Sequence, residues 1–347
     1  MPEFQRRVMY LFPGQGSQYR GMGLDLWQQF PVAKATYERA NEVLGFDIAQ
    51  MSFADPGNEL DFTRYTQPAL LTHSIACLRV FEELTGSPIR PAVTAGHSLG
   101  EFSALVAAGV LTFEQALLVV QKRGELMGKY GRGRMVAFNL DLEAIRSVGG
   151  HYCQVGGCNL PEQTTVGGLE HDLETLVSAV KAKFPRARAV PLKTEGAFHT
   201  YLMIQAAEEF RAFLDGIEFA PPHSDTKVLS NFTADFHEPT ADAIRAALFF
   251  QMFNPVKWVW SMERVLAVAN GQEDTAPLVD TIVEFGGGLG AADSAVKRPN
   301  LESITRKILN SCGHPGVYIP AINAASVTRA ADFFNGVDLG QTAQAQG

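Results

Sequence analysis

The segment Gly96–Leu105, GHSLGEFSAL, places a serine between two glycines, directly after the mostly apolar run Ala92–Ala95. It fits the pattern G-x-S-x-G, in which a sharp turn from a strand into a helix exposes the oxygen of Ser98. The start of that helix would supply backbone N–H groups and partial positive charge beside an oxyanion. The alternative is a small serine in a tight turn, but the flanking strand and helix favour a nucleophile.

Strands and helices alternate around this turn, which predicts an α/β fold with a parallel sheet. The expected strands are Val8–Phe12, Ala92–Ala95 and Ile282–Phe285. The expected helices are Asp25–Leu44, Pro68–Leu84, Glu101–Ala108 and Phe113–Tyr130.

Between Arg134 and Val190 the pattern changes to short β-like runs around two helices, Leu142–Val148 and Leu173–Phe184. The order strand–helix–strand–strand–helix–strand is typical of a ferredoxin-like unit. We therefore expect a large α/β-hydrolase-like domain (1–132 and 199–310) with a small ferredoxin-like subdomain (133–198) inserted into it. The pattern weakens beyond Asn310, so 311–347 is expected to be a partly disordered C-terminal extension.

The bulk composition excludes several classes of protein. A net charge of −8 and a pI near 5.5 argue against a nucleic-acid partner. No apolar run reaches the length of about 18 residues that a membrane span requires, so no membrane association is expected. Four cysteines are too few for a disulfide scaffold in 347 residues, and a cytoplasmic location is the simpler interpretation.

A serine nucleophile needs a base, and His199 stands where the inserted region rejoins the main body. His97 is expected to point away from the serine oxygen, and His73 to lie in the core. The other five histidines stand in polar loops and are expected at the surface: His151, His171, His223, His237 and His314. His151 with Cys153 and Cys158 would offer a metal only three ligands, so no metal site is expected.

The segment Phe12–Gln18, FPGQGSQ, follows the first expected strand. Ligands of α/β folds bind at the carboxyl ends of strands, so this loop could supply a second backbone donor to the oxyanion. A glycine-rich turn is the alternative. The loop does not match G-x-G-x-x-G, which argues against a nucleotide site.

Five segments occur in order and span most of the chain: FPGQGSQ (12–18), YTQPAL (65–70), GHSLGE (96–101), GAFH (196–199) and NPVKW (254–258). Together they resemble the malonyl-CoA:acyl-carrier-protein transacylase family, the acyltransferases of fatty-acid and polyketide synthases. The resemblance implies a free-standing enzyme that moves malonyl from malonyl-CoA to the phosphopantetheine thiol of an acyl carrier protein, with no cofactor of its own.

The resemblance also assigns roles to individual residues. Ser98 would be the acylated nucleophile, His199 its base, and the backbone N–H groups of Gln15 and Leu99 the oxyanion hole. The residues expected to contact the acyl group or to orient the base are Arg123 for the malonate carboxylate, Gln67 and Phe198 near the acyl chain, and Lys257 through its backbone carbonyl. An arginine suits the first of these roles because its planar guanidinium binds a carboxylate through two parallel hydrogen bonds.

Two departures from the family pattern lie near the expected substrate surfaces. Gly287 and Tyr201 stand where relatives often carry proline, and both could reshape the acyl site. These departures favour an enzyme of a polyketide pathway. An acidic carrier would need basic surface, for which the candidates are Arg132, Arg134, Arg186, Arg188 and Lys193.

Three alternatives stay open at this point. The first is an acyl hydrolase that removes stalled acyl groups from carrier proteins, and Arg123 argues against it because neutral chains gain nothing from a cationic clamp. The second is a transacylase for an unusual extender unit, for which the bulky Phe198 leaves little room. The third is a non-catalytic carrier-docking module, which would not need Ser98 and His199.

Overall fold

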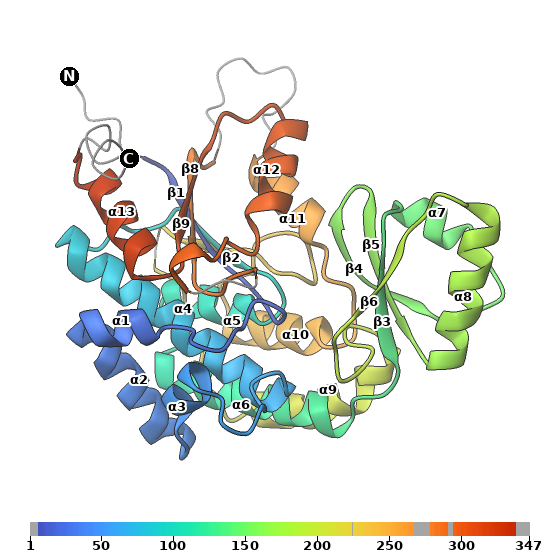
Figure 1. Cartoon of the computed structure of the whole chain (residues 1–347), viewed down its shortest axis with the longest axis horizontal. Coiled ribbons are helices and arrows are strands. Elements are labelled where there is room, and N and C mark those ends of the chain that lie inside the picture. The colour runs from blue at the N-terminus through green and yellow to red at the C-terminus, as the bar shows by residue number, and fades with distance from the viewer. Residues whose placement is uncertain (1–5, 224, 267–277, 291–293, 338–347) are drawn as a thin grey trace.

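The computed structural model describes residues 6–223, 225–266, 278–290 and 294–337 (Figure 1). Its larger sheet has the strand order β7-β2-β1-β8-β9, and all four pairings are parallel. The strands of this sheet are β1 (Val8–Phe12), β2 (Val93–Gly96), β7 (Lys227–Val228), β8 (Thr281–Phe285) and β9 (Val317–Ala321). The prediction of an α/β fold with a parallel sheet is confirmed.

Helices cover both faces of the larger sheet. Strand β1 is buried along its whole length, and its alternate residues enter two different cores. Tyr10 belongs to the core of the N-terminal helices, whereas Met9 and Leu11 belong to the core beneath α11 and α12. A strand buried on both faces reads as a continuous apolar run, which is why VMYLF shows no alternation.

The helices of the larger body carry the labels of Figure 1. They are α1 (Leu24–Gln29), α2 (Pro31–Leu44), α3 (Ile48–Phe53), α4 (Thr63–Thr85), α5 (Gly100–Ala107), α6 (Phe113–Lys129), α9 (Ile204–Leu214), α10 (Ala241–Gln251), α11 (Trp258–Leu266), α12 (Glu302–Ser311) and α13 (Ala324–Phe334), with short 3₁₀ turns at Tyr201–Met203 and Ser294–Val296.

Helix α4 begins at Thr63, so the prediction of a helix start at Pro68 was wrong. The side chain of Glu195 accepts a hydrogen bond from the Thr63 backbone N–H and so caps the helix from a distant segment. This contact extends the helix by a full turn ahead of the proline. The single helix expected over Asp25–Leu44 is divided in two at Phe30, directly before Pro31.

The smaller sheet has the order β4-β5-β3-β6 with antiparallel pairings, and it stands beside the larger body (Figure 1). The elements of this region are β3 (Arg134–Phe138), α7 (Leu142–Arg146), β4 (Gln154–Leu160), β5 (Gln163–Gly168), α8 (Glu170–Lys183) and β6 (Ala189–Leu192). The predicted order of strands and helices is therefore present. The names α/β-hydrolase-like and ferredoxin-like, and the boundaries at 132 and 199, stay interpretations.

The expectation of a separate C-terminal extension from 311 was wrong for much of that segment. Strand β9 pairs with β8 over five residue positions, and α13 packs against α4 and β9. This last strand reaches the sheet edge only through tertiary contacts, so the local pattern gave little sign of it. The terminal GQTAQAQG lies outside the described residues. No helix within the described ranges has the length and apolar content to cross a membrane.

Candidate active site

The predicted turn at Ser98 is present between β2 and α5. Ser98 has a φ of 51°, in the left-handed region that few non-glycine residues adopt. A Cβ on Gly96 would lie 1.9 Å from the carbonyl carbon of Gly100, and one on Gly100 would lie 2.1 Å from the Phe12 oxygen. Only glycine fits at these two positions, and their close approach holds Ser98 in its strained conformation.

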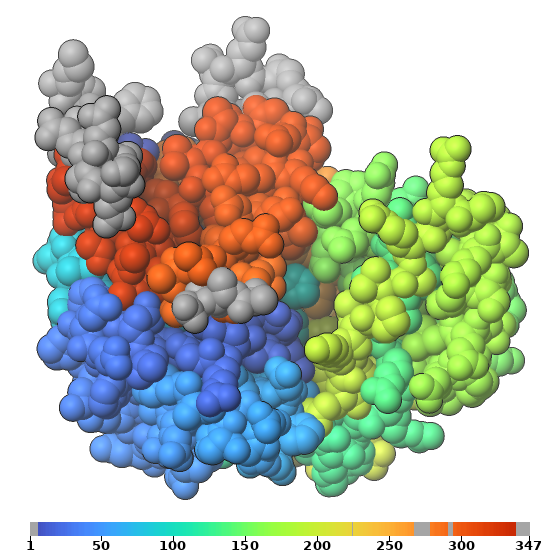
Figure 2. Space-filling view, in the orientation of Figure 1, coloured from blue at the N-terminus to red at the C-terminus, as the bar shows by residue number. Residues whose placement is uncertain are grey.

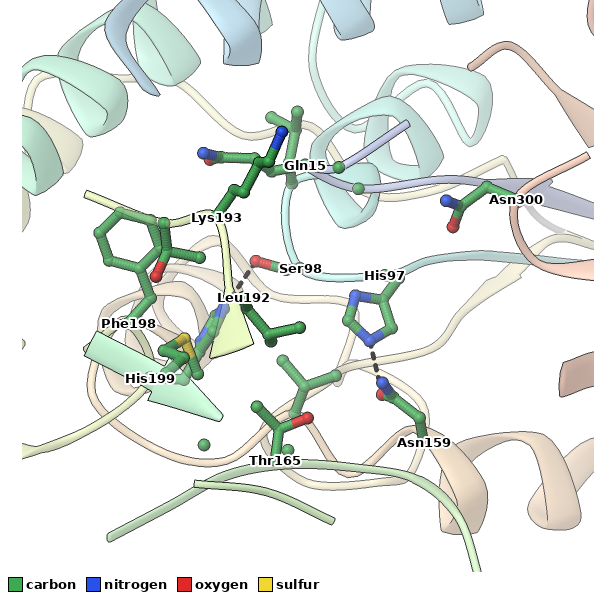
Figure 3. Close-up of a pocket in the computed structure, with 18 of the residues that line it drawn as sticks. Gln15, His97, Ser98, Asn159, Thr165, Leu192, Lys193, Phe198, His199 and Asn300 are labelled. Atoms are coloured by element: carbon green, nitrogen blue, oxygen red, sulfur yellow. Dashed lines mark hydrogen bonds between the residues drawn. The ribbon is translucent and has the colours of Figure 1, made fainter. Parts of the chain in front are cut away.

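The base predicted from its position, His199, contacts the nucleophile directly (Figure 3). Its Nε2 lies 2.7 Å from Ser98 Oγ, and its Nδ1 lies 2.8 Å from the backbone oxygen of Gln251. A carbonyl can only accept, so Nδ1 carries the proton and Nε2 is left to accept one from the serine. The geometry therefore allows proton transfer from the Ser98 hydroxyl to His199, as a nucleophile–base pair requires.

The carbonyl that orients His199 belongs to Gln251, so the assignment of Lys257 to this role was wrong. Gln251 is the last residue of α10, where helix carbonyls lack partners within the helix and are free to accept. Lys257 instead donates its backbone N–H to Asn231.

Burial is the largest cause that lowers the pKa of His199, and the positive charge of Arg123 adds to it. The hydrogen bond that His199 donates to the Gln251 carbonyl raises the pKa in part, and the net value is about 3. The native pKa thus lies below the unfolded value of 6.5. The stability that neutral His199 contributes is present above pH 6.5 and is lost as the pH falls from 6.5 toward 3.

We expect kcat/KM for acylation of the free enzyme to stay flat between about pH 5 and 8, because His199 is already neutral there. The rate of adduct formation at limiting acyl donor, measured across this range, checks the expectation. If kcat/KM instead fell to half its plateau near pH 6.5, which is the pKa of an unperturbed histidine, the expectation would be contradicted.

Arg123, on α6, lies beside the nucleophile and is 1% exposed. Its Nη2 is 3.1 Å from Ser98 Oγ and 2.9 Å from Gln251 Oε1. Burial lowers the pKa of Arg123 to about 10, so the guanidinium stays charged at neutral pH. Its Nε is buried and has no hydrogen-bond partner among the described residues. The Arg123 side chain also lines the cavity at Ser98, and a charged donor in that position is suited to hold an anionic group of a substrate.

The two backbone donors predicted for the oxyanion lie on the loop after β1 and at the start of α5. Within the described ranges, neither the N–H of Gln15 nor that of Leu99 has a hydrogen-bond partner. The Ser98 N–H, by contrast, donates to Asn231 Oδ1 at 2.6 Å. Gln15 and Leu99 are therefore available to an oxyanion, whereas the serine's own N–H is not.

Gly287 supports the loop that carries Gln15 and does not line the cavity of the site. Its φ is 66°, and a Cβ here would lie 2.7 Å from Ser17 Oγ and 2.8 Å from Pro13 Cγ. Tyr201 does not line the cavity either, and its backbone N–H donates to Gln154. The expectation that these two departures reshape the acyl site is not supported.

A cavity of about 510 Å³ opens at Ser98, where the smaller subdomain meets the larger body (Figures 2 and 3). The larger body supplies Gln15, Leu99 and Arg123, and the segment from β6 to His199 supplies Leu192, Lys193 and Phe198. Gln67 lies behind the wall, where its amide donates to Met127 Sδ at 3.3 Å.

The site contains four residues to which the sequence analysis gave no role: Glu101, Asn231, His237 and Gln251. His237 was predicted at the surface, but its side chain is 1% exposed and its Nε2 lies 2.7 Å from Glu101 Oε1. His314 is buried as well. Glu101 closes the GHSLGE segment and Gln251 precedes NPVKW by three positions, so motif proximity was the one available signal.

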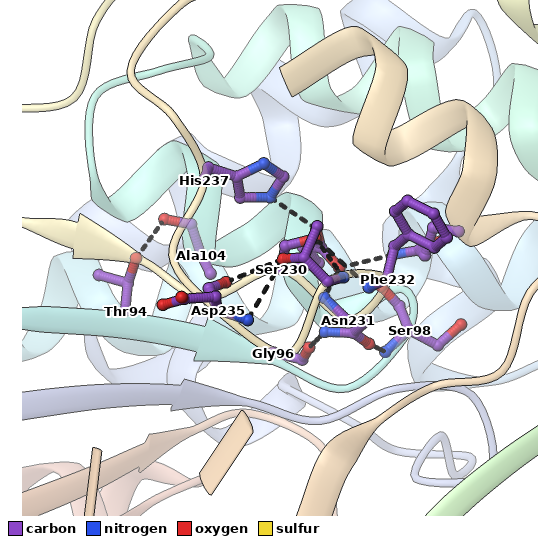
Figure 4. Close-up of polar contacts among 12 residues, drawn as sticks. Thr94, Gly96, Ser98, Ala104, Ser230, Asn231, Phe232, Asp235 and His237 are labelled. Atoms are coloured by element: carbon purple, nitrogen blue, oxygen red, sulfur yellow. Dashed lines mark hydrogen bonds and ion pairs between the residues drawn. The ribbon is translucent and has the colours of Figure 1, made fainter. Parts of the chain in front are cut away.

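Asn231 fixes the strained turn from behind (Figure 4). Its Oδ1 accepts from the Ser98 N–H, and its Nδ2 donates to Gly96 O at 2.8 Å. We expect Asn231→Leu to destabilise the protein by about 1–3 kcal/mol, because two buried backbone groups lose their partners. Denaturant unfolding checks the effect. Asn254→Leu is the control, because the Asn254 amide donates to Phe250 O in an exposed hydrogen bond. A loss no larger than the control's would contradict this role for Asn231.

His151, one of the three metal ligands considered in the sequence, has both ring nitrogens engaged in hydrogen bonds. His151 Nε2 contacts Val148 O at 2.9 Å, and its Nδ1 accepts from the Cys153 N–H at 3.1 Å. In the part of the chain that the structure describes, no group of three histidine, cysteine or acidic side chains could hold a metal ion.

Comparisons with known proteins were made for sequence and for structure. The family model described as acyl transferase domain matches residues 9–270. A malonyl CoA-acyl carrier protein transacylase of Bacillus subtilis is 39% identical over 292 residues, which cover 81% of this chain and 87% of the relative. A polyketide biosynthesis malonyl CoA-acyl carrier protein transacylase of the same organism is 34% identical over 75% of this chain and 88% of its own length.

Two solved structures share the fold. One is a malonyl-transacylase in complex with its type II PKS acyl-carrier protein: the TM-score is 0.80 at 35% identity, over 94% of this chain and 99% of that chain. The other is an acyl carrier protein S-malonyltransferase of Vibrio cholerae, with a TM-score of 0.79 at 34% identity over 93% and 99%.

Proposed function

The chain belongs to the acyl transferase family and, within it, to the malonyl-CoA:acyl-carrier-protein transacylases, and from this membership we propose how its site transfers a malonyl group. The observation that carries the proposal is the position of Arg123, whose Nη2 lies 3.1 Å from the nucleophilic oxygen. A malonyl thioester has its reactive carbonyl two bonds from a carboxylate. A cation beside the nucleophile can therefore bind the carboxylate while the serine attacks the carbonyl.

The reaction begins with acylation of the enzyme. His199 Nε2 takes the proton of Ser98 as Oγ attacks the thioester carbon of malonyl-CoA. The tetrahedral oxyanion accepts hydrogen bonds from the N–H groups of Gln15 and Leu99. The carbon–sulfur bond then breaks, and the imidazolium returns its proton to the sulfur as coenzyme A leaves.

The second half reverses these steps with a different thiol. The phosphopantetheine thiol of an acyl carrier protein enters the cavity and loses its proton to His199 as it attacks the seryl ester. Collapse of the second tetrahedral intermediate breaks the ester bond and restores Ser98. The reaction needs no cofactor, because both thiols belong to its substrates. Lys193, exposed at the cavity mouth, is one basic residue that an acidic carrier would meet.

A role in a polyketide pathway is the finer part of the proposal. It is supported by likeness to a polyketide biosynthesis transacylase and to the structure of a malonyl-transacylase in complex with a type II PKS acyl-carrier protein. The likeness to transacylases whose names mention no pathway is of similar strength.

Discharge of the loaded enzyme tests the proposal. Protein incubated with malonyl-CoA is freed of excess substrate and mixed with a phosphopantetheinylated carrier protein, and both are weighed by mass spectrometry. We expect malonyl to leave the enzyme and to appear on the carrier, with little discharge when the carrier lacks its phosphopantetheine. Discharge to free malonate at the same rate with either carrier would identify a hydrolase instead.

A further inference from the structure

A buried carboxylate, that of Glu101, contacts Asn231 and His237 (both labelled in Figure 4) and has no place in the reaction just described. Glu101, on α5, is 0% exposed. Its Oε1 lies 2.7 Å from His237 Nε2, and its Oε2 accepts from the Asn231 N–H at 3.0 Å. Burial of a carboxylate is costly unless its charge is compensated, so the position of Glu101 requires a reason.

The third partner of Glu101 leads to the substrate-binding arginine. The amide nitrogen of Gln251 donates to Glu101 Oε2 at 2.8 Å and to Ser98 O at 3.1 Å. Both hydrogens of the Gln251 amide are therefore donated to acceptors, and this fixes the orientation of the amide. Its Oε1 must then face Arg123 Nη2, 2.9 Å away. A chain of two hydrogen bonds thus joins the carboxylate to the guanidinium.

An arginine that binds a substrate carboxylate in a buried site has a physical problem in the empty enzyme. Its charge needs compensation, yet a directly paired acid would occupy the donors that the substrate must use. An acid separated from the arginine by one amide side chain still supplies the opposite charge. It does not occupy the guanidinium N–H groups that the substrate carboxylate needs. The attraction of Glu101 raises the pKa of Arg123 against the larger effect of burial, and the Arg123 side chain lines the cavity at Ser98.

We propose that Glu101 is the counter-ion of Arg123, held at a distance by the Gln251 amide so that the guanidinium remains charged and is not covered by a directly paired acid where it lines the cavity for the substrate carboxylate. His237 completes the hydrogen bonding of Glu101 on its far side. The identity of the substrate carboxylate rests on the proposed function, but the pairing of the two buried charges does not. Glu101 is a positioning residue, since it touches neither substrate nor the reacting atoms.

A double-mutant cycle on thermal stability, without substrate, tests the pairing. Glu101→Gln keeps the shape of the side chain and removes its charge; Arg123→Met removes the cation. We expect each single variant to lower Tm by roughly 5–10 °C, because each leaves one buried charge uncompensated. The double variant should recover at least half of the summed loss. Additive losses would overturn the proposal.

Glu284 offers a matched control. It is also 0% exposed, and its carboxylate accepts from the Leu301 N–H and from Tyr318. Glu284→Gln combined with Arg123→Met should be additive, and equal non-additivity in both cycles would overturn the specific pairing. If Glu101→Gln alone does not fold, the double variant should still fold, because no uncompensated charge remains. A double variant that is also unfolded would count against the proposal.

A second measurement separates this inference from the proposed function. In a Ser98→Ala background, which prevents turnover, malonyl-CoA should raise the Tm of Glu101→Gln more than it raises that of the parent, because the ligand supplies the missing anion. Acetyl-CoA should give equal shifts. If malonyl-CoA raises the Tm of Glu101→Gln and that of its parent by the same amount, the electrostatic role of Glu101 is overturned. Failure of malonyl transfer in the wild-type protein would leave the substrate-free cycle, and hence the pairing, intact.

Discussion

Ser98→Ala is expected to lower malonyl transfer to a carrier protein by at least about 10⁴-fold while the protein stays folded. The alanine removes Ser98 Oγ, the atom that both His199 Nε2 and Arg123 Nη2 contact. No acyl-enzyme can then form, and the residual rate is that of bound substrates reacting without a nucleophile. Steady-state transfer from malonyl-CoA, with product weighed on the carrier, gives the rate.

Ser103→Ala is the matched control for this prediction. Ser103 is another buried serine of the same segment, 1% exposed, and it does not line the cavity. We expect its variant to transfer malonyl within a few-fold of the wild type. A Ser98→Ala protein with more than a tenth of wild-type activity would show that the nucleophile lies elsewhere, or that transfer is direct between the two thiols.

Arg123→Met is expected to lower kcat/KM for malonyl-CoA by about 10²–10³-fold, because a desolvated, charge-assisted contact with the substrate carboxylate is worth roughly 3–4 kcal/mol. Acetyl-CoA has no carboxylate, so its slow acylation should stay within a few-fold or rise. The selectivity for malonyl over acetyl would therefore collapse. Parallel acylation assays with the two thioesters measure both rates.

Two further variants sharpen this prediction. Arg123→Lys should restore little, since lysine keeps the charge but lacks the planar fork that binds a carboxylate. Arg79→Met is the control, because Arg79 also packs over a phenylalanine ring, at 4.8 Å against 5.5 Å for Arg123, but lies outside the cavity. An equal loss with both thioesters in Arg123→Met would assign the arginine to folding or to the dyad, and not to the carboxylate.

The parts of the site that local sequence determines were predictable. The turn at Ser98 needs glycines on both sides because the backbone of Gly96 approaches Gly100 and that of Gly100 approaches Phe12. The five consecutive residues Gly96–Gly100 contain both glycines, so the local sequence predicts the turn. The position of His199 was predicted from where the inserted region ends, and its contact with Ser98 is present in the structure.

The parts that tertiary contact determines were not predictable. Any residue type can supply a backbone carbonyl, so nothing in the sequence distinguished Gln251 from Lys257 as the partner of His199. Glu101, Asn231 and His237 come from α5 and from the loop after β7, and they meet only once the sheet has formed. A histidine in a polar loop carries no sign that it will be buried against an acid.

In the fold, too, the elements set by local sequence were predicted and those set by tertiary contacts were not. Helix α6 begins at Phe113, as predicted, because its start depends on local contacts: Thr112 and Gln115 satisfy each other's backbone within one turn. Strand β9 was missed because its pairing partner, β8, lies more than thirty positions earlier in the chain. Helix α4 began earlier than expected because its capping group, Glu195, comes from a distant segment.

We propose that Ser98 carries a malonyl group that Arg123 selects. Mass spectrometry of the intact protein after separate incubation with malonyl-CoA, acetyl-CoA and methylmalonyl-CoA tests both parts of this proposal, with peptide mapping of any adduct. We expect a malonyl adduct on Ser98 that forms much faster than the acetyl adduct and is absent from Ser98→Ala. Acetyl and malonyl adducts that form at equal rates, or an adduct that persists in Ser98→Ala, would contradict it.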